Sequence, residues 1–218
     1  MNKRPILDFL CDLRRNNSKD WMDAHRERYH TAKDIWLREV QVYLDRLATH
    51  DATIGLLEPR QTIMRINNNN VFHPEKPTYK HHFGFDPYKG KDNPAFYVHV
   101  EPGNCFIAGG VWHPTPGALK DLRGAFDYDG EKLKAIVADA DFAAYFGGLD
   151  EDEQALKTSP RDYPDDHRHI DLLRRKNFTV THEVTQVEVL ADDFVAEVER
   201  AFLLLRPFNA YLRRAIGG

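Results

Sequence analysis

The chain has 218 residues, of which 42% are hydrophobic and 29% charged, and its formal net charge is −4. This length supports one sizeable core, and because no linker interrupts the sequence we expect a single domain over residues 1–218. The two cysteines, Cys11 and Cys105, are too few for a disulfide framework or a cysteine-based zinc site, and they indicate a reducing compartment. No stretch approaches the roughly 18 apolar residues of a membrane span, and Asp8 and Asp12 interrupt the first apolar run too early for a signal peptide. We therefore expect a soluble, cytoplasmic protein.

The first 50 residues have the apolar spacing of helices. Apolar side chains recur every three or four positions up to Leu13, after which Asn16, Asn17 and Ser18 provide a stop and a new N-cap. A longer helical run follows, and one broad stripe along it is expected to cover the core. The stripe consists of Trp21, His25, Tyr29, Trp36, Val40, Tyr43, Leu44 and Leu47.

The middle of the chain predicts β structure. We expect a loop over residues 51–59 and a short strand over residues 61–66, which leaves Arg65 at a strand end beside the asparagines at 67–70. Residues 95–112 predict a β-hairpin with its tip at Pro102-Gly103, because two β-rich runs flank this turn signal. The pairing places Tyr97, His99, Phe106 and Trp112 on one face and Phe96, Val98, Val100, Ile107 and Val111 on the other, apolar face.

The second half is mainly helical. Thr115-Pro116 predicts a helix start, residues 130–146 a further helical stretch that ends at Gly147-Gly148, and residues 177–184 a strand. Thr185 and Glu188 have the spacing of a capping box, and the final helix over residues 194–216 is expected to be interrupted by Pro207. Helices and strands do not alternate strictly, which favours an α+β fold with a largely antiparallel sheet packed against long N- and C-terminal helices.

A basic, polar segment is the strongest candidate for a binding surface. Between Arg60 and Lys91 there are six basic residues and two acidic ones, a local charge of +4 in a chain whose net charge is −4. Such an excess points to an anionic partner. The candidate ligand-binding side chains are Arg65, Asn68, Asn69, Lys76 and Lys80, and Tyr79 is a candidate for acid–base catalysis.

The same residues also have structural interpretations. The guanidinium of Arg65 could grip a phosphate or carboxylate through paired donors, or it could satisfy backbone carbonyls at the strand end. The asparagines could read a polar ligand or simply bond their own loop. The lysines could contact an anion or remain solvated.

Further candidates lie outside this segment. His99 shares its predicted strand face with Tyr97 and Trp112 and could be a general base, a ligand or a satisfied half-buried histidine. Arg161 and Tyr163 could anchor their own proline-bounded turn, or they could complete one anion pocket with the basic segment.

A metal site is the competing idea. Ligand-type side chains occur at His73, His81, His99, His113, Asp165, Asp166, His167 and His169. Their spacing matches no recognised metal motif such as His-Glu-x-x-His. We therefore predict neither a required metal nor another cofactor.

Motifs spread over nearly the whole chain carry a family resemblance. They are Phe9-Leu10 through Asn16-Asn17 to Trp21, Arg65-Ile66 through Phe72 and Lys76 to Tyr79-Lys80, Tyr97-x-His99, Gly110-x-Trp112-x-Pro114, and Pro160-Arg161-x-Tyr163 before Asp166-His167. In this combination the chain resembles the domain of unknown function 2461 family of soluble α+β proteins. Members usually carry Arg-Asp and a further Arg at places where Asn68, Asn69 and Val71 stand here. The resemblance implies the fold and the location of a site, and it implies no activity.

These observations predict a polar cleft that binds an anionic or phosphorylated small molecule. The basic segment supplies most of its surface, His99 or Tyr79 supplies acid–base chemistry, and Trp112, Arg161 and Tyr163 line it. The alternative is a non-enzymatic binding module for nucleic acid or a protein partner, in which aromatic side chains act as stacking platforms. The net negative charge argues against nucleic acid. The sequence decides neither between enzyme and binding protein nor the oligomeric state.

Overall fold

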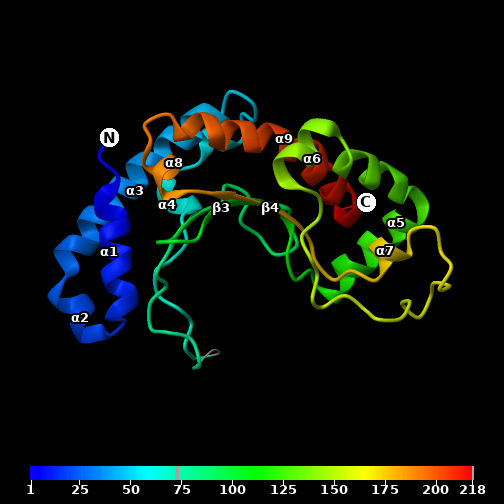
Figure 1. The fold of residues 1–218 in the computed structure, drawn as a ribbon, viewed down its shortest axis with the longest axis horizontal. Coiled ribbons are helices and arrows are strands. Elements are labelled where there is room, and N and C mark those ends of the chain that lie inside the picture. Colours follow the sequence, from blue (N-terminus) through cyan, green and yellow to red (C-terminus); the bar gives the residue numbers. More distant parts are fainter. Residues whose placement is uncertain (72–73, 218) are drawn as a thin grey trace. The chain divides into compact units, whose positions relative to one another are not determined.

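The computed structural model describes residues 1–71 and 74–217 and shows an α+β fold (Figure 1). A four-stranded antiparallel sheet has the order β1-β2-β3-β4. The strands are β1 (Phe83–Phe85), β2 (Ala95–Val100), β3 (Cys105–Val111) and β4 (Phe178–Val184). The predicted fold class is therefore confirmed. None of the described helices is long and apolar enough to cross a membrane.

Backbone contacts group the chain into two compact units, each built from three stretches. Unit 1 comprises Met1–Pro87, Tyr97–Ile107 and Glu183–Arg200. Unit 2 comprises Tyr88–Phe96, Ala108–His182 and Ala201–Gly218. The single-domain expectation stays a prediction, and each unit is described by itself.

The N-terminal helices of unit 1 begin and end where the sequence signals predict. They are α1 (Arg4–Arg15), α2 (Lys19–Ala24) and α3 (Arg26–Leu47), followed by the 3-10 turn η1 (Ile54–Leu56). The Ser18 hydroxyl accepts a hydrogen bond from the Trp21 amide and so caps α2. The long predicted stripe is divided between α2 and α3, because the chain leaves helical geometry at His25.

Helix α3 covers the apolar face of the sheet in unit 1. The Trp36 ring stacks on Phe83 at 6.1 Å, and the Tyr43 ring meets Phe85 edge-on at 5.6 Å. Val98 is also fully buried, and each such side chain contributes about 1.5–3 kcal/mol of hydrophobic stabilisation. The apolar layer predicted for the hairpin is confirmed, since Phe96, Val98, Val100, Ile107 and Val111 are all buried.

The hairpin over β2 and β3 is confirmed, whereas the strand predicted over residues 61–66 is wrong. A short helix, α4 (Pro59–Thr62), occupies its beginning, because Pro59 favours a first helical turn and the Gln61 side chain accepts from the Glu58 amide at 2.6 Å. Isolated bridges follow, from Ile63 to Phe85 and from Asn67 to Tyr79. The strand that pairs with β2 is instead β1.

Unit 2 is built around a kinked helix. Helix α5 (Pro116–Val137) starts at the Thr115 cap as predicted, and it leaves helical geometry at Asp129, where φ is −139°. The predicted stretch over residues 130–146 is therefore the end of α5 followed by α6 (Ala140–Phe146), which ends in the left-handed Gly147. Helix α7 (Ile170–Leu173) precedes β4.

The chain ends in α8 (Gln186–Leu190) and α9 (Phe194–Gly217). The capping box is confirmed, since the Thr185 hydroxyl accepts from the Glu188 amide and the Glu188 carboxylate accepts from the Thr185 amide. The expected interruption at Pro207 is wrong, because α9 continues through it. Buried Leu205 and Phe208 on either side hold the helix against the core of unit 2.

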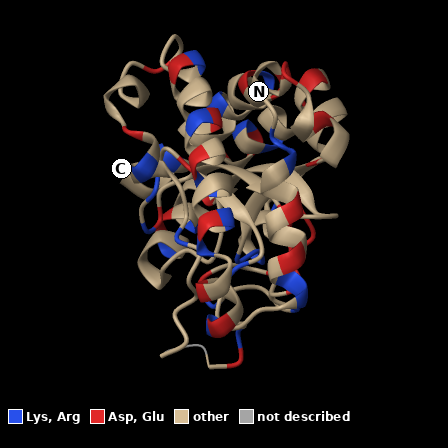
Figure 2. Ribbon diagram, turned by 90° about the vertical axis from the view of Figure 1, so that its left-hand side faces the viewer, with Lys and Arg blue, Asp and Glu red and all other residues tan. Residues whose placement is uncertain are grey.

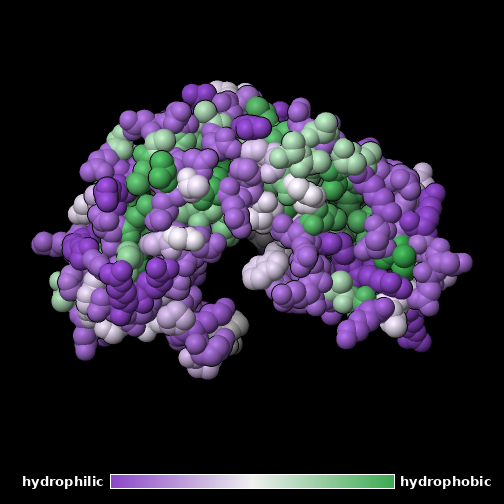
Figure 3. All heavy atoms as spheres, in the orientation of Figure 1, coloured by the Kyte–Doolittle hydropathy of each residue, from purple (hydrophilic) through white to green (hydrophobic). Residues whose placement is uncertain are grey.

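Charged residues of both signs are interspersed along the helices (Figure 2). Hydrophilic side chains predominate on the face shown in Figure 3, with apolar side chains gathered in patches between them. The polar groups that meet in one place, rather than a surface of uniform charge, therefore define the candidate site.

Candidate functional site

The polar face of the β1–β2 pair in unit 1 collects residues that the sequence separates. Gly84 pairs with His99 in the antiparallel register, and the last pair of the ladder is Phe83 with Val100. Continued by one more position, two beyond Gly84 and His99, the same register sets His82 opposite Glu101. Opposed residues in antiparallel strands share a face, and side chains two positions apart share it as well. Tyr97, His99 and Glu101 of one strand therefore stand on the same side as His82.

The His99 ring is fixed on three sides. Its Nδ1 lies 3.1 Å from the Tyr97 hydroxyl, and its Nε2 lies 2.9 Å from Oε2 of Glu101. The Phe106 ring stacks on it at 4.4 Å with an interplanar angle of 9°. Only 6% of His99 is exposed, so its position is set by protein contacts rather than by solvent.

Glu101 is the centre of the cluster. Its Oε1 lies 2.8 Å from Nε2 of His81, while Oε2 is shared by His99 and the Asn104 amide. The His82 ring lies 4.3 Å from the His99 ring. One ligand atom from each of His82, His99 and Glu101 lies within 4.8 Å of the others.

Burial sets the charge state of these groups. It lowers the pKa of the His82 imidazole to about 4, and the neighbouring His99 acts in the same direction. Burial also lowers the pKa of His99, against the opposing effect of the Glu101 hydrogen bond. Burial alone would raise the pKa of Glu101, but hydrogen bonds from His99 and Asn104 outweigh it, and the pKa is lowered. Near neutral pH these effects leave His82 and His99 uncharged and Glu101 as a carboxylate.

The profile of a family described as "Conserved hypothetical protein (DUF2461)" matches residues 5–211. The chain belongs to this family. The motif resemblance is thereby confirmed over nearly the full length. No curated protein and no solved structure matches the chain. For this DUF2461 protein, the chemistry has to be argued from the site itself.

Some lysine and asparagine side chains of the basic segment close their own loop. The Lys80 ammonium donates to the carbonyls of Arg65 and Asn67 at 2.9 and 2.8 Å. The Asn68 amide donates to the carbonyl of Pro77. The structural interpretation is therefore present in the geometry for Lys80 and Asn68. Their binding role, and that of the exposed Arg65, Asn69 and Lys76, stays a prediction.

Tyr79 lies at the base of that loop. It is 7% exposed, and the Asn17 side chain bonds both its amide and its carbonyl, at 2.9 and 2.8 Å. The Asn17 side chain thus pairs with the Tyr79 backbone as a residue of a neighbouring strand would. This anchoring fits a core position, and the catalytic role of Tyr79 stays a prediction.

Three predicted ligand-binding residues belong to unit 2. Trp112 follows β3, is 72% exposed and lies against the His113 ring at 4.2 Å. Tyr163 is half-buried with its ring 6.0 Å from that of His167, and Arg161 is exposed. The pocket that these residues would share with the basic segment joins two units and stays a prediction.

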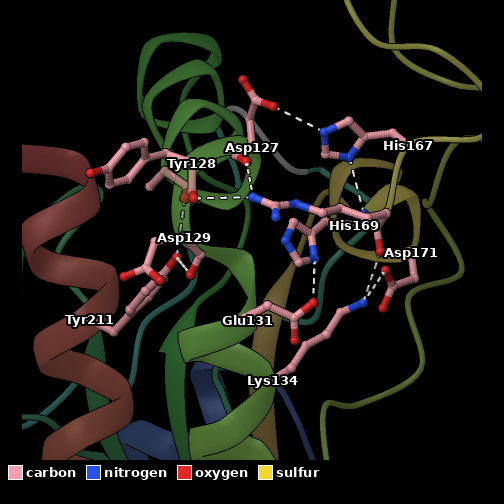
Figure 4. Close-up of polar contacts among 11 residues, drawn as sticks. Asp127, Tyr128, Asp129, Glu131, Lys134, His167, His169, Asp171 and Tyr211 are labelled. Carbon is pink, nitrogen blue, oxygen red and sulfur yellow. Dashed lines mark hydrogen bonds and ion pairs between the residues drawn. The ribbon is translucent and has the colours of Figure 1, made fainter.

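A second histidine group in unit 2 fastens the chain to the kink of α5 (Figure 4). His167 Nε2 lies 3.0 Å from the Asp127 carboxylate, and its Nδ1 accepts from the His169 amide. The His169 ring is fully buried against Gly130, where an added Cβ would lie 2.7 Å from it. Its Nδ1 is 3.8 Å from Oε1 of Glu131.

The histidines considered as metal ligands from sequence thus have different roles. Asp165 accepts from the Ser159 amide, Asp166 is exposed and His113 lies beside Trp112. His73 lies outside the described residues. Within the described ranges, the group with metal-like spacing is His82, His99 and Glu101.

Sequence reasoning placed His99 and Tyr97 on one face but did not single out Glu101, which directly precedes the predicted tip at Pro102-Gly103. The signal was present in the alternation Tyr97-x-His99-x-Glu101, since period two puts all three on one face. The partner alternation, His82-x-Gly84, was hidden because β1 has only three residues.

Proposed function

We propose that unit 1 binds a divalent transition-metal ion through His82, His99 and Glu101. The observation that supports this most directly is the convergence of two imidazole nitrogens and a carboxylate oxygen within 4.8 Å. Imidazole and carboxylate are the donors of zinc sites and of related transition-metal sites. Three protein ligands with one position left open is the arrangement of catalytic zinc sites.

The residues present fit such an ion. Metal ligation needs neutral imidazoles and an ionised carboxylate, which are the forms favoured here. Metal-bound histidines usually hold their second nitrogen against a protein partner, and Tyr97 stands at Nδ1 of His99 at 3.1 Å. Bonds of about 2.1 Å separate ligands by roughly 3.4 Å around a tetrahedral ion, so the set would contract modestly by side-chain rotation.

The function that follows is metal-dependent binding of an anionic small molecule. An ion in such a site polarises a bound oxygen and lowers the pKa of bound water. The anionic ligand expected from the basic segment would take the open position. Besides burial, the positive charge of Lys80 helps to lower the pKa of His82, and the same charge favours an anion beside it.

Metal titration tests the proposal. We expect the wild-type protein, freed of metal by a chelator, to take up about one Zn²⁺ or Co²⁺ per chain in calorimetry and elemental analysis. His82→Ala and Glu101→Gln should each weaken Zn²⁺ binding by more than the about 10- to 100-fold caused by losing a partner that only orients a ligand. His30→Ala, which removes an exposed histidine of α3, is the control. Wild-type protein that takes up no ion, or variants that bind as the control does, would disprove the metal centre.

A metal-free proton relay is the second candidate. It is favoured by the two short contacts of Glu101, at 2.8 Å to His81 and 2.9 Å to His99. Carboxylate-oriented imidazoles of this kind act in general acid–base catalysis, and His81 is 32% exposed and so reaches solvent. Inorganic phosphate separates the two candidates. If it raises the melting temperature as much in chelator as with Zn²⁺, the relay is favoured; if it does so only with Zn²⁺, the metal centre is.

A further inference from the structure

We infer that Tyr97 is a positioning residue for His99. Its hydroxyl donates a hydrogen bond to Nδ1 of His99 in the metal-free protein and accepts one from Nδ1 when a metal is bound. The inference rests on the proposed metal site. Tyr97, His99 and Glu101 stand on alternate positions along the chain, so the hydroxyl and the carboxylate hold opposite edges of one imidazole, at Nδ1 and Nε2.

Without metal, the hydrogens available on these three side chains fix the directions of the hydrogen bonds between Tyr97, His99 and Glu101. An ionised carboxylate only accepts hydrogen bonds, so Nε2 of His99 carries the hydrogen that points to Glu101. In a neutral imidazole the other nitrogen is then an acceptor. Nδ1 therefore accepts from the Tyr97 hydroxyl across 3.1 Å.

Metal binding at Nε2 would reverse the direction of the hydrogen bond between Tyr97 and Nδ1 of His99. The ion needs the lone pair of that nitrogen, so the Nε2 hydrogen leaves to solvent and a hydrogen from solvent occupies Nδ1, which leaves the ring neutral. Nδ1 now donates, and the Tyr97 oxygen accepts. A hydroxyl can fill both roles because it has one donor and two acceptor lone pairs. A phenylalanine at this position could fill neither.

Gly84 makes the space that the hydroxyl occupies. It pairs with His99 in the strand register, and a Cβ added there would lie 2.5 Å from the Tyr97 oxygen and 2.8 and 2.9 Å from two ring carbons. Contacts that short force the ring to move. Gly84 is thus part of the arrangement that holds the Tyr97 hydroxyl at Nδ1.

Nitrogen-15 NMR of the His99 side chain tests the inference. In metal-free wild-type protein we expect the hydrogen on Nε2, and after saturation with Zn²⁺ we expect it on Nδ1. Tyr97→Phe and Gly84→Ala should each weaken Zn²⁺ binding by about 10- to 100-fold, the range for a partner that orients a metal-bound histidine. Tyr29→Phe, which removes a hydroxyl elsewhere in unit 1, should leave both readouts unchanged.

Two results would overturn the inference: a hydrogen on Nδ1 in the metal-free protein, or Tyr97→Phe binding Zn²⁺ as wild type does. If wild-type protein binds no metal, the proposed function fails while the role of Tyr97 is still tested. In that case the metal-free spectrum must show Nδ1 as an acceptor in wild type and a changed Nδ1 shift in Tyr97→Phe, or the inference fails too.

Discussion

At the scale of single residues, Lys80 has the structural role that the sequence analysis considered for Arg65. A strand-end arginine was the candidate for satisfying backbone carbonyls, and the lysine for contacting a ligand. In the structure the Lys80 ammonium bonds the carbonyl of Arg65 itself and that of Asn67. A charged side chain that bridges two loop carbonyls stabilises the loop, whatever else it contacts.

Lys80→Met is therefore expected to lower stability. The variant keeps the aliphatic stem and loses two hydrogen bonds from a charged donor, each worth up to about 1.5–3 kcal/mol. Because Lys80 is only half-buried, we expect a loss of about 1 kcal/mol in the free energy of unfolding, measured by urea denaturation. Lys76→Met, which removes an exposed ammonium of the same segment, should change it by less than about 0.5 kcal/mol. Equal effects of the two variants would contradict the structural role of Lys80.

His169 should make stability depend on pH. Burial lowers the pKa of His169, as do the positive charges of Lys134 and Arg168, while Glu131 acts in the opposite direction. The unfolded chain, with a pKa of about 6.5, binds the proton more readily than the folded protein. The stabilising effect is therefore present above pH about 6.5 and is lost as the pH falls below that value.

His169→Phe is the variant that isolates this effect. It keeps a ring against Gly130 and removes the titrating group. Urea denaturation at a series of pH values from 8 to 5 should show a smaller acid-side loss of stability in the variant than in wild type. His82 and His99 contribute to the loss in both proteins, so the difference between the two curves is the quantity of interest. Parallel curves would show that His169 does not cause the loss of stability at acid pH.

At the scale of elements, two contacts fix the kink of α5. The break at Asp129 places Gly130 against the buried His169 ring, and the Tyr211 hydroxyl bonds the Asp129 carbonyl at 3.1 Å. A methyl group on Gly130 would overlap the His169 ring, which is fully buried. The kink is thus fixed by steric fit as well as by hydrogen bonds.

Gly130→Ala should accordingly destabilise the protein by about 1–3 kcal/mol, the usual effect of overpacking. Gly124→Ala is a matched control in the same helix, because an added Cβ there meets nothing within 4 Å. It should stabilise by about 0.5–1 kcal/mol through helix propensity. In a double-mutant cycle, His169→Ala should remove most of the Gly130→Ala penalty. Additive effects of the two changes would contradict a direct clash.

The elements that sequence reasoning placed correctly are those with strong local signals. Pro102-Gly103 marked the hairpin, and Ser18, Thr115 and Thr185 marked helix starts. The strand predicted over residues 61–66 failed because the helix-starting signals at Pro59 and Gln61 outweighed a short β-rich run. β1 was missed because three residues are too few to show a period of two. The candidate site was missed in part for the same reason, since only the β1–β2 register brings His82 to Glu101.

At the scale of the whole molecule, metal binding should appear as added stability. A ligand at about 100 times its dissociation constant raises the free energy of unfolding by about 2.7 kcal/mol when it binds only the folded state. We expect Zn²⁺ to give wild-type protein an increase of this size in urea denaturation, and to give Glu101→Gln much less. Equal stabilisation of both proteins would place zinc outside the proposed site.

The contacts at the base of the basic loop have a consequence for loop length. The Asn67–Tyr79 bridge holds the two ends of the loop together, and the Asn17 side chain anchors the Tyr79 end, shortly before His81 and His82. Doubling the length of a closed loop costs only about 0.6 kcal/mol of closure entropy. Insertions or deletions between Asn67 and Tyr79 should thus leave both histidines in place. In unit 1, the sequence that could select a ligand can vary in length independently of the side chains that would hold an ion.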